Sequence, residues 1–220
     1  MRDLLRRRAF LVQKRTSMLL SMRGAFECRT GMRVKSGEVK GWTENDLEQF
    51  LEDPTMRLGV TCLIEPVKAI DAQVGVIEKC VLAQAKLRPE FRLLQTVWGI
   101  GKVLALTVMY EVGNVARFPE VGNFASYCRC VTTDRLSNGK RKGSGNAKNG
   151  NPYLSWAFTE AAHFANRHRP PAQRFVQRKR AKTNGIVANR ALAHKLARAS
   201  YYVMRDQVEF QPERLFGSAS

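Results

Sequence analysis

FRLLQTVWGIGKVLALTVMYEVG, residues 91–113, predicts two apolar helices joined by a tight turn. Gly99 and Gly101 permit the turn, because a residue without a Cβ atom adopts backbone angles that other residues avoid. The backbone N–H groups at the start of the second helix could then receive a phosphate, with Lys102 beside them. This arrangement is typical of a helix-hairpin-helix motif, although two helices packed in a core give the same pattern. The sequence alone leaves both interpretations open.

Long helices are also predicted before this stretch. Residues 2–26 repeat apolar pairs every seven positions, with Arg and Lys between them, which indicates a basic amphipathic helix with a coiled-coil seam. A second apolar seam, spaced alternately by three and four, predicts a long helix that begins at Pro66. The two seams could pair as an antiparallel hairpin, bind a second subunit, or pack inside the core of one domain.

The link between these helices is predicted to contain a loop and a short helix. Residues 31–41 are rich in Gly, Lys and Ser, which favours a loop. Thr43 with Asp46 three residues later is the pattern of a capped helix start, and Pro54 follows the predicted helix.

The C-terminal half is predicted to continue as helices with one small hairpin. The expected elements are a helix from Pro119 to Cys128, a strand over 131–133, a two-residue turn at Asn138-Gly139, a helix opened by Pro152, a helix over 186–205 and a poorly ordered tail after Phe210. The predicted fold is therefore mainly α, an N-terminal coiled-coil hairpin followed by a helix-hairpin-helix domain with a small β-hairpin. The expected divisions are a basic helical region over 1–90, a domain over 91–210 and a tail over 211–220.

The chain is strongly basic. Its 37 Lys and Arg residues against 19 Asp and Glu give a formal net charge of +18, which argues for a polyanionic partner. Nucleic acid is the first candidate and an anionic membrane surface the second, although no apolar run reaches the length of a membrane span. The five cysteines and three histidines form no metal-ligand pattern. Reduced thiols and no metal site are therefore expected.

Residues 134–155 place one serine, Ser137, at the head of a Gly/Asn turn and follow it with a dense set of cations. These cations are Lys140, Arg141, Lys142 and Lys148. A hydroxyl beside a flexible cationic loop is suited to a phosphodiester partner, while the plain alternative is a solvated basic loop with an ordinary turn serine. A second basic segment, residues 167–182, contains no acid and includes Arg178, Lys179 and Arg180.

Several short motifs follow one another in this half of the chain. They are Gly-Ile-Gly, Glu-Val-Gly, Arg-Phe-Pro, Phe-Ala-Ser-Tyr-Cys-Arg, Ser-Asn-Gly-Lys, Lys-Asn-Gly-Asn and Ala-Phe-Thr-Glu-Ala-Ala. In this order they resemble the C-terminal half of insertion-sequence transposases of the IS116/IS110/IS902 type. These recombinases have an N-terminal DEDD domain of Holliday-junction-resolvase type and a C-terminal domain that bears a serine. The N-terminal Leu-Leu-Arg-Arg-Arg-Ala-Phe-Leu-Val-Gln-Lys-Arg-Thr resembles the family's linker into its coiled coil, so the resemblance covers essentially the whole chain.

The resemblance implies a DNA transposase that cleaves and exchanges strands with a serine nucleophile, a position held here by Ser137. Arg135, Lys140 and Arg141 are the candidates to stabilise charge on the phosphate. Ser144 is a rival serine, but it lies in Gly-Ser-Gly, where a role in flexibility is expected. The residues expected to contact nucleic acid are Gly99, Gly101, Lys102, Lys140, Arg141, Lys142, Lys148, Asn151, Arg178, Lys179 and Arg180.

The four carboxylates of the family's DEDD domain have no counterpart in this sequence. Magnesium is therefore expected only in that missing domain, no cofactor is expected in this chain, and the chain is expected to be a truncated copy. The implied partners are DNA, an element-encoded bridge RNA and a second copy bound through the coiled coil, in the bacterial cytoplasm at the nucleoid. The alternative is a nucleic-acid-binding remnant or accessory protein without chemistry.

Overall fold

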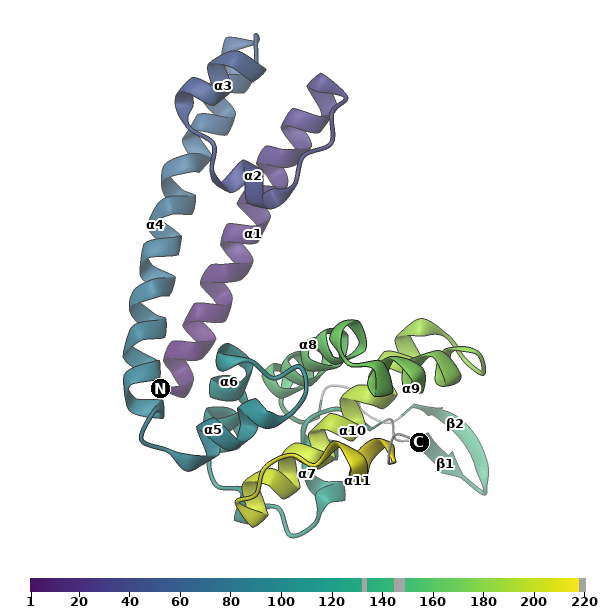
Figure 1. Cartoon of the computed structure of the whole chain (residues 1–220). Coiled ribbons are helices and arrows are strands. Elements are labelled where there is room, and N and C mark those ends of the chain that lie inside the picture. The colour runs from purple at the N-terminus through teal and green to yellow at the C-terminus, as the bar shows by residue number, and fades with distance from the viewer. Residues whose placement is uncertain (132–133, 145–148, 218–220) are drawn as a thin grey trace. The chain divides into compact units, whose positions relative to one another are not determined.

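A computed structural model describes residues 1–131, 134–144 and 149–217, and this part of the chain is mainly α, as predicted (Figure 1). The chain forms two compact units, one over Asp3–Leu82 and one over Ala83–Ser220. No helix in the described ranges combines the length and the apolar composition that crossing a membrane requires.

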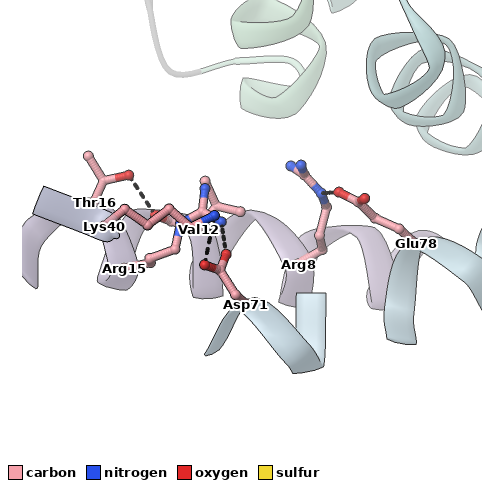
Figure 2. A network of polar contacts seen from close by, with 7 residues as sticks. All are labelled: Arg8, Val12, Arg15, Thr16, Lys40, Asp71 and Glu78. Carbon is pink, nitrogen blue, oxygen red and sulfur yellow. Dashed lines mark hydrogen bonds and ion pairs between the residues drawn. The ribbon is translucent and has the colours of Figure 1, made fainter. Parts of the chain in front are cut away.

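The first unit is built on two long helices, α1 (Arg2–Thr30) and α4 (Pro54–Ala85), which run antiparallel (Figure 1). Two ion pairs join them, Arg8 with Glu78 and Arg15 with Asp71 (Figure 2). The partners lie seven residues apart on each helix but in opposite order along the chain, which fixes an antiparallel register with a heptad step. Of the three predicted arrangements, the antiparallel pairing within one chain is observed, and it includes packing in a shared core. Regular supercoiling and binding of a second subunit stay predictions.

The end of this helix pair away from the N-terminus is closed by a small aromatic core. Phe26 of α1 contacts Trp42 and Phe50, with ring centroids 5.0 Å and 5.8 Å away. Two short helices bring these rings together, α2 (Ser36–Lys40) and α3 (Glu44–Phe50). The prediction that residues 31–41 form only a loop is wrong, because Val39 of α2 is buried in this core and anchors one helical turn.

The capping prediction at the start of α3 is confirmed. The Thr43 hydroxyl accepts from the Asp46 backbone N–H at 3.3 Å, and the Asp46 carboxylate accepts from the Thr43 N–H at 2.8 Å. These reciprocal bonds satisfy two backbone donors that a helix start otherwise leaves without partners.

The predicted start of the second long helix at Pro66 is wrong. α4 begins twelve residues earlier, where the Asp53 carboxylate accepts from the Thr55 N–H at 2.9 Å, and Pro66 lies inside the helix. A proline in a helix interior removes one backbone bond and costs about 3 kcal/mol. Val60 and Ile64 before it and Val67 after it are buried in the same core, so packing on both sides of Pro66 outweighs this loss.

The second unit contains the remaining helices of the described ranges. They are α5 (Pro89–Thr96), α6 (Lys102–Val112), the 3-10 turn η1 (Val115–Arg117), α7 (Val121–Tyr127), α8 (Pro152–His168), α9 (Pro170–Arg180), α10 (Gly185–Asp206) and α11 (Pro212–Phe216). α10 is central and packs against α5, α7, α8 and α9. The apolar face predicted for α8 is confirmed, since Leu154, Phe158 and Ala161 are fully buried.

A two-stranded antiparallel sheet interrupts the helices between α7 and α8. It consists of β1 (Asp134–Ser137) and β2 (Lys140–Ser144), with Ser137 paired to Lys140 across the turn. Asn138 and Gly139 have φ angles of 49° and 71°. These left-handed angles are those of the tight hairpin turn that Asn-Gly predicts. Of the strand predicted over 131–133, Val131 is not part of a strand, and residues 132–133 lie outside the described ranges.

The segment after Phe210 was predicted to be poorly ordered, and this is wrong for residues up to 217. The Phe210 N–H donates to the Thr96 hydroxyl at 2.9 Å, and α11 follows it. Phe216 stacks on Trp98 with ring centroids 5.2 Å apart. Aromatic anchors therefore hold this segment against α5 and the turn that follows it.

Candidate nucleic-acid and serine site

Ser137 lies at the end of β1, next to the tight turn, as predicted. Its side chain is exposed, and so are those of Lys140 and Lys142 on β2. The register pairs Lys140 with Ser137 across the turn, so a cationic residue stands beside the serine in the hairpin. A polyanion could approach this hairpin from solvent and meet both groups.

Both ends of the segment that carries the hairpin are fixed to the helical body. On the incoming side, the Arg129 guanidinium donates to the Asn149 carbonyl at 3.2 Å, and Arg190 of α10 donates to the Arg129 carbonyl at 2.7 Å. On the outgoing side, the Asn151 N–H donates to the Tyr127 carbonyl at 2.7 Å. These bonds attach Arg129 and residues 149–151, on either side of the hairpin in sequence (its base), to α7 and α10.

The base is close-packed at Gly150. This residue has a φ of +95°, and a Cβ atom there would lie 2.5 Å from the Tyr127 carbonyl oxygen. Only glycine fits a position that combines a left-handed backbone with such a close approach. The Gly-Asn part of the Lys-Asn-Gly-Asn motif thus packs against the end of α7.

A buried polar network lies beneath this base. The Asn151 amide group donates to the Glu111 carboxylate at 2.6 Å, and its carbonyl oxygen accepts from the Tyr153 and Leu154 N–H groups at 2.8 Å and 3.1 Å. Asn151 therefore caps α8 and binds the end of α6 at once, although only 4% of its surface is exposed. The side chain of Asn151 is therefore not exposed for the predicted contact with nucleic acid.

Tyr127 and Arg117 extend this network. The Arg117 guanidinium lies 4.6 Å from the centre of the Tyr127 ring. Burial raises the pKa of the Tyr127 phenol, but hydrogen bonds with Asn151 and Arg117 and the positive charge of Arg117 outweigh it, so the pKa is lowered overall. Glu-Val-Gly, Arg-Phe-Pro, Phe-Ala-Ser-Tyr-Cys-Arg and Lys-Asn-Gly-Asn, four separate motifs in the sequence, thus meet at the foot of the serine hairpin.

The two cysteines near the hairpin are structural. Cys128 and Cys130 are buried, and burial raises the pKa of both thiols, to about 12 for Cys130. A thiol in this state is neither a nucleophile nor a metal ligand. In the ranges that the structure describes, no three His, Cys, Asp or Glu side chains are grouped closely enough to hold a metal ion. The described residues therefore do not fit the magnesium of a DEDD domain.

The glycine turn at 99–101 has the predicted helix–turn–helix form, but its two glycines differ. Gly99 has a φ of +82°, and a Cβ atom there would lie 2.0 Å from the Ala161 carbonyl oxygen of α8. Gly101 and Lys102 are both exposed, and a Cβ atom at Gly101 would meet no atom within 4 Å. Gly99 thus serves helix packing, whereas Gly101 and Lys102 remain accessible.

A cavity of about 600 Å³ adjoins this turn. Its lining combines cationic and aromatic side chains, including Lys102, Arg169, Trp98 and Phe164. The Arg169 guanidinium lies 5.6 Å from the centre of the Trp98 ring. Trp98 is half-buried, and an arginine beside an aromatic ring is common on surfaces that bind nucleic acid.

The remaining predicted contacts divide into two groups. Arg178, Lys179 and Arg180 form the exposed last turn of α9. Lys148 lies outside the described residues, and so do the side chains of Arg135, Arg141 and Ser144. The roles expected of these four residues stay predictions.

Sequence reasoning did not assign roles to Glu111, Arg117, Tyr127, Arg129 and Arg190. The first four stand in the quoted motifs, and the signal that could have found them was the order of those motifs. Arg190 lies in no motif, and its bond to a backbone carbonyl carries no sequence signal.

Two comparisons with known proteins bear on this chain. Residues 91–177 match the sequence model of the family described as Transposase IS116/IS110/IS902. The chain is also 26% identical over 169 residues to a transposase for insertion sequence element IS1111A from Coxiella burnetii (strain RSA 493 / Nine Mile phase I). That alignment covers 75% of this chain and 46% of the relative, so the chain spans about half the length of the protein it matches. Residues 91–177, which hold the hairpin, its base and the glycine turn, are thus the part of the chain that is similar to the IS116/IS110/IS902 transposase family.

Proposed function

We propose that this chain is the serine-bearing, DNA-binding part of an insertion-sequence transposase and that Ser137 is its nucleophile. The observation that carries the proposal is the exposed Ser137 on a hairpin whose base is held by the family's own motif residues. A plain basic loop with a turn serine would not need a buried network beneath it.

The proposed step is a transesterification. The Ser137 oxygen attacks a DNA phosphorus, the bond to the 3′ oxygen breaks, and the proton of the hydroxyl ends on the departing 3′ oxygen. A phosphoserine link and a free 3′-hydroxyl result. Attack of another 3′-hydroxyl on that link reverses the step and completes strand exchange. Each phosphoester bond that breaks is replaced by another, so the step needs no energy source.

Cations near the hairpin supply the electrostatic part of this step. The phosphate gains negative charge in the transition state, which fixed positive charges stabilise. Lys140 lies opposite Ser137 in the register and is the described candidate. Arg135 and Arg141, from the same two strands, are proposed to assist. Lys102 and the end of α9 would hold flanking DNA through its phosphates.

A trapped adduct tests the proposal. The full chain is incubated with DNA from the ends of its insertion sequence in which sulfur replaces the bridging 3′ oxygen at the cleavage site. Sulfur leaves readily and religates poorly, so a covalent complex accumulates and shifts in a denaturing gel. Wild type and Ser144→Ala are expected to form the adduct, and Ser137→Ala is expected to form none.

The other outcomes are equally informative. An adduct with Ser137→Ala would show that another residue attacks the DNA. Salt-dependent binding without any adduct from wild type would contradict the catalytic claim and favour a nucleic-acid-binding protein without chemistry, which the net charge of +18 alone would explain. The resemblance suggests three further proposals: that a DEDD half with magnesium, a bridge RNA and a second copy of the chain each take part.

A further inference from the structure

A second cavity, whose lining includes no residue of the serine hairpin, lies between α10 and the segment that leads into α11. Its volume is about 660 Å³. The side chains that matter for its chemistry are His194, Lys195, Arg198, Tyr202 and Arg214. None of the roles derived above uses this cavity.

Lys195 is a fixed cation at its edge. Its ammonium group donates to the Leu215 carbonyl at 2.9 Å and lies 5.2 Å and 5.9 Å from the ring centres of Phe175 and Phe216. A lysine held by a carbonyl and two rings presents its charge at one place, unlike a freely moving surface lysine.

Positive charges crowd around this lysine. Burial, followed by the charges of Arg198, Lys179 and Arg178, lowers the pKa of Lys195. Burial and the charges of Arg198 and Lys195 likewise lower the pKa of His194. Like charges held this close repel one another, and a bound anion would relieve the repulsion.

Two acids also line the cavity, but they do not neutralise it. Asp206 accepts from the Arg205 guanidinium at 2.6 Å, so its charge is already paired. Glu209 is exposed on the other wall. Lys195, Arg198 and Arg214 leave an excess of positive charge.

An aromatic ring stands beside these cations. Tyr202 is 38% exposed, with the Tyr201 ring at 5.4 Å and the Arg205 guanidinium at 4.8 Å from its centre. These contacts hold the ring in place while part of it stays open to solvent. A held aromatic ring next to cations suits an unpaired base and its phosphate.

We propose that this cavity binds single-stranded nucleic acid, with backbone phosphates at Lys195, Arg198 and Arg214 and one base stacked on Tyr202. A duplex keeps its bases paired and cannot offer one to the ring. The inference deepens the proposed function by naming a strand type. It rests on the nucleic-acid binding proposed there but not on the chemistry of Ser137.

Fluorescence anisotropy of the full chain tests this inference. The probes are labelled single strands of about 12 nucleotides of DNA and of RNA, the same DNA as a duplex, and a DNA strand with abasic sites. Tyr202→Ala should weaken single-strand binding by at least about fivefold, whereas Tyr202→Phe keeps the ring and should bind as wild type. On the abasic strand Tyr202→Ala should have no effect. The DNA and RNA arms show which strand the cavity prefers.

A matched pair of arginines tests the phosphate contacts. Arg198→Ala should lower the salt slope of single-strand binding by about 0.7, and Arg92→Ala, an exposed arginine outside the cavity, should leave it unchanged. Unchanged single-strand affinity in both Tyr202→Ala and Arg198→Ala, or an equal loss on the duplex, would overturn the inference. The Ser137 adduct would still form in either case, so the proposed function would stand separately. Thermal unfolding by circular dichroism confirms that each variant is folded.

Discussion

Gly99 and Gly101 flank the same turn but meet different surroundings. A Cβ atom at Gly99 would lie 2.0 Å from the Ala161 carbonyl oxygen, and one at Gly101 would meet no atom within 4 Å. We predict that Gly99→Ala lowers the free energy of unfolding by about 2–4 kcal/mol, because α8 must shift and the backbone is strained. Gly101→Ala should change it by less than about 1 kcal/mol. Urea unfolding followed by circular dichroism measures both, and equal losses would contradict the packing role of Gly99.

Asn151 joins three elements through one side chain, so its substitutions separate two functions. Asn151→Ala should lower the free energy of unfolding by about 2–4 kcal/mol, since it removes the cap of α8 and a donor to the buried Glu111 carboxylate. Asn151→Ser keeps an oxygen for the cap and should lose less. Thermal unfolding ranks the two variants. If Asn151→Ser is as unstable as Asn151→Ala, the cap contributes nothing.

What the sequence could predict at this scale depends on how local each feature is. Ser137 at a turn follows from the adjacent Asn138-Gly139, and the structure places it there. The bond between Glu111 and Asn151 joins positions 40 residues apart. It exists only because α6 and α8 pack together, which no single motif states.

Among the elements, local signals again predicted the structure better than distant ones. The capping pair Thr43 and Asp46 marks the start of α3 correctly, because both residues lie in one helical turn. Pro66 is wrongly predicted as the start of a helix, because its place inside α4 depends on the buried residues that pack on both sides of it. α11 is not predicted for a similar reason. Its Phe216 is held by Trp98, which follows α5, and by Phe175 of α9, so the helix depends on distant rings and not on its own five residues.

The pairing of α1 with α4 gives a prediction with a pH dependence. Asp71 binds both Arg15 and Lys40 (Figure 2). Burial raises the pKa of Asp71, but the hydrogen bonds and charges of these two partners lower it by more. The pKa in the folded protein therefore lies below the ordinary value. Its stabilising effect is therefore complete at neutral pH and is lost as the pH falls below about 4.

Asp71→Asn should lower the free energy of unfolding at pH 7 by about 1 kcal/mol and have little effect near pH 3. Glu65→Gln serves as the control, because Glu65 forms an exposed pair with Lys68 on the same helix. Denaturant unfolding at both pH values provides the measurement. A difference between wild type and Asp71→Asn that grows as the pH falls would refute the assigned sign.

For the whole molecule, the charge excess predicts how DNA binding responds to salt. Each phosphate contact that is lost should lower the slope of log affinity against log salt by about 0.9 for duplex DNA. We expect such a decrease for Lys140→Ala and for Lys179→Ala, which are exposed on the hairpin and on α9. Lys86→Ala, exposed near the end of α4, should leave the slope unchanged. Equal slopes for all three variants and wild type would remove the hairpin and α9 from the DNA surface.

The central claim is that the Ser137 oxygen forms the bond to DNA, and peptide mapping of the trapped adduct tests it most directly. Trypsin cleaves after Arg135 and Lys140 and again after Lys142 and Lys148, so Ser137 and Ser144 fall in different peptides. After nuclease digestion, mass spectrometry should find a nucleotide on the peptide of residues 136–140 and fragment it to Ser137. A nucleotide on the peptide of residues 143–148, or on any other residue, would contradict the account.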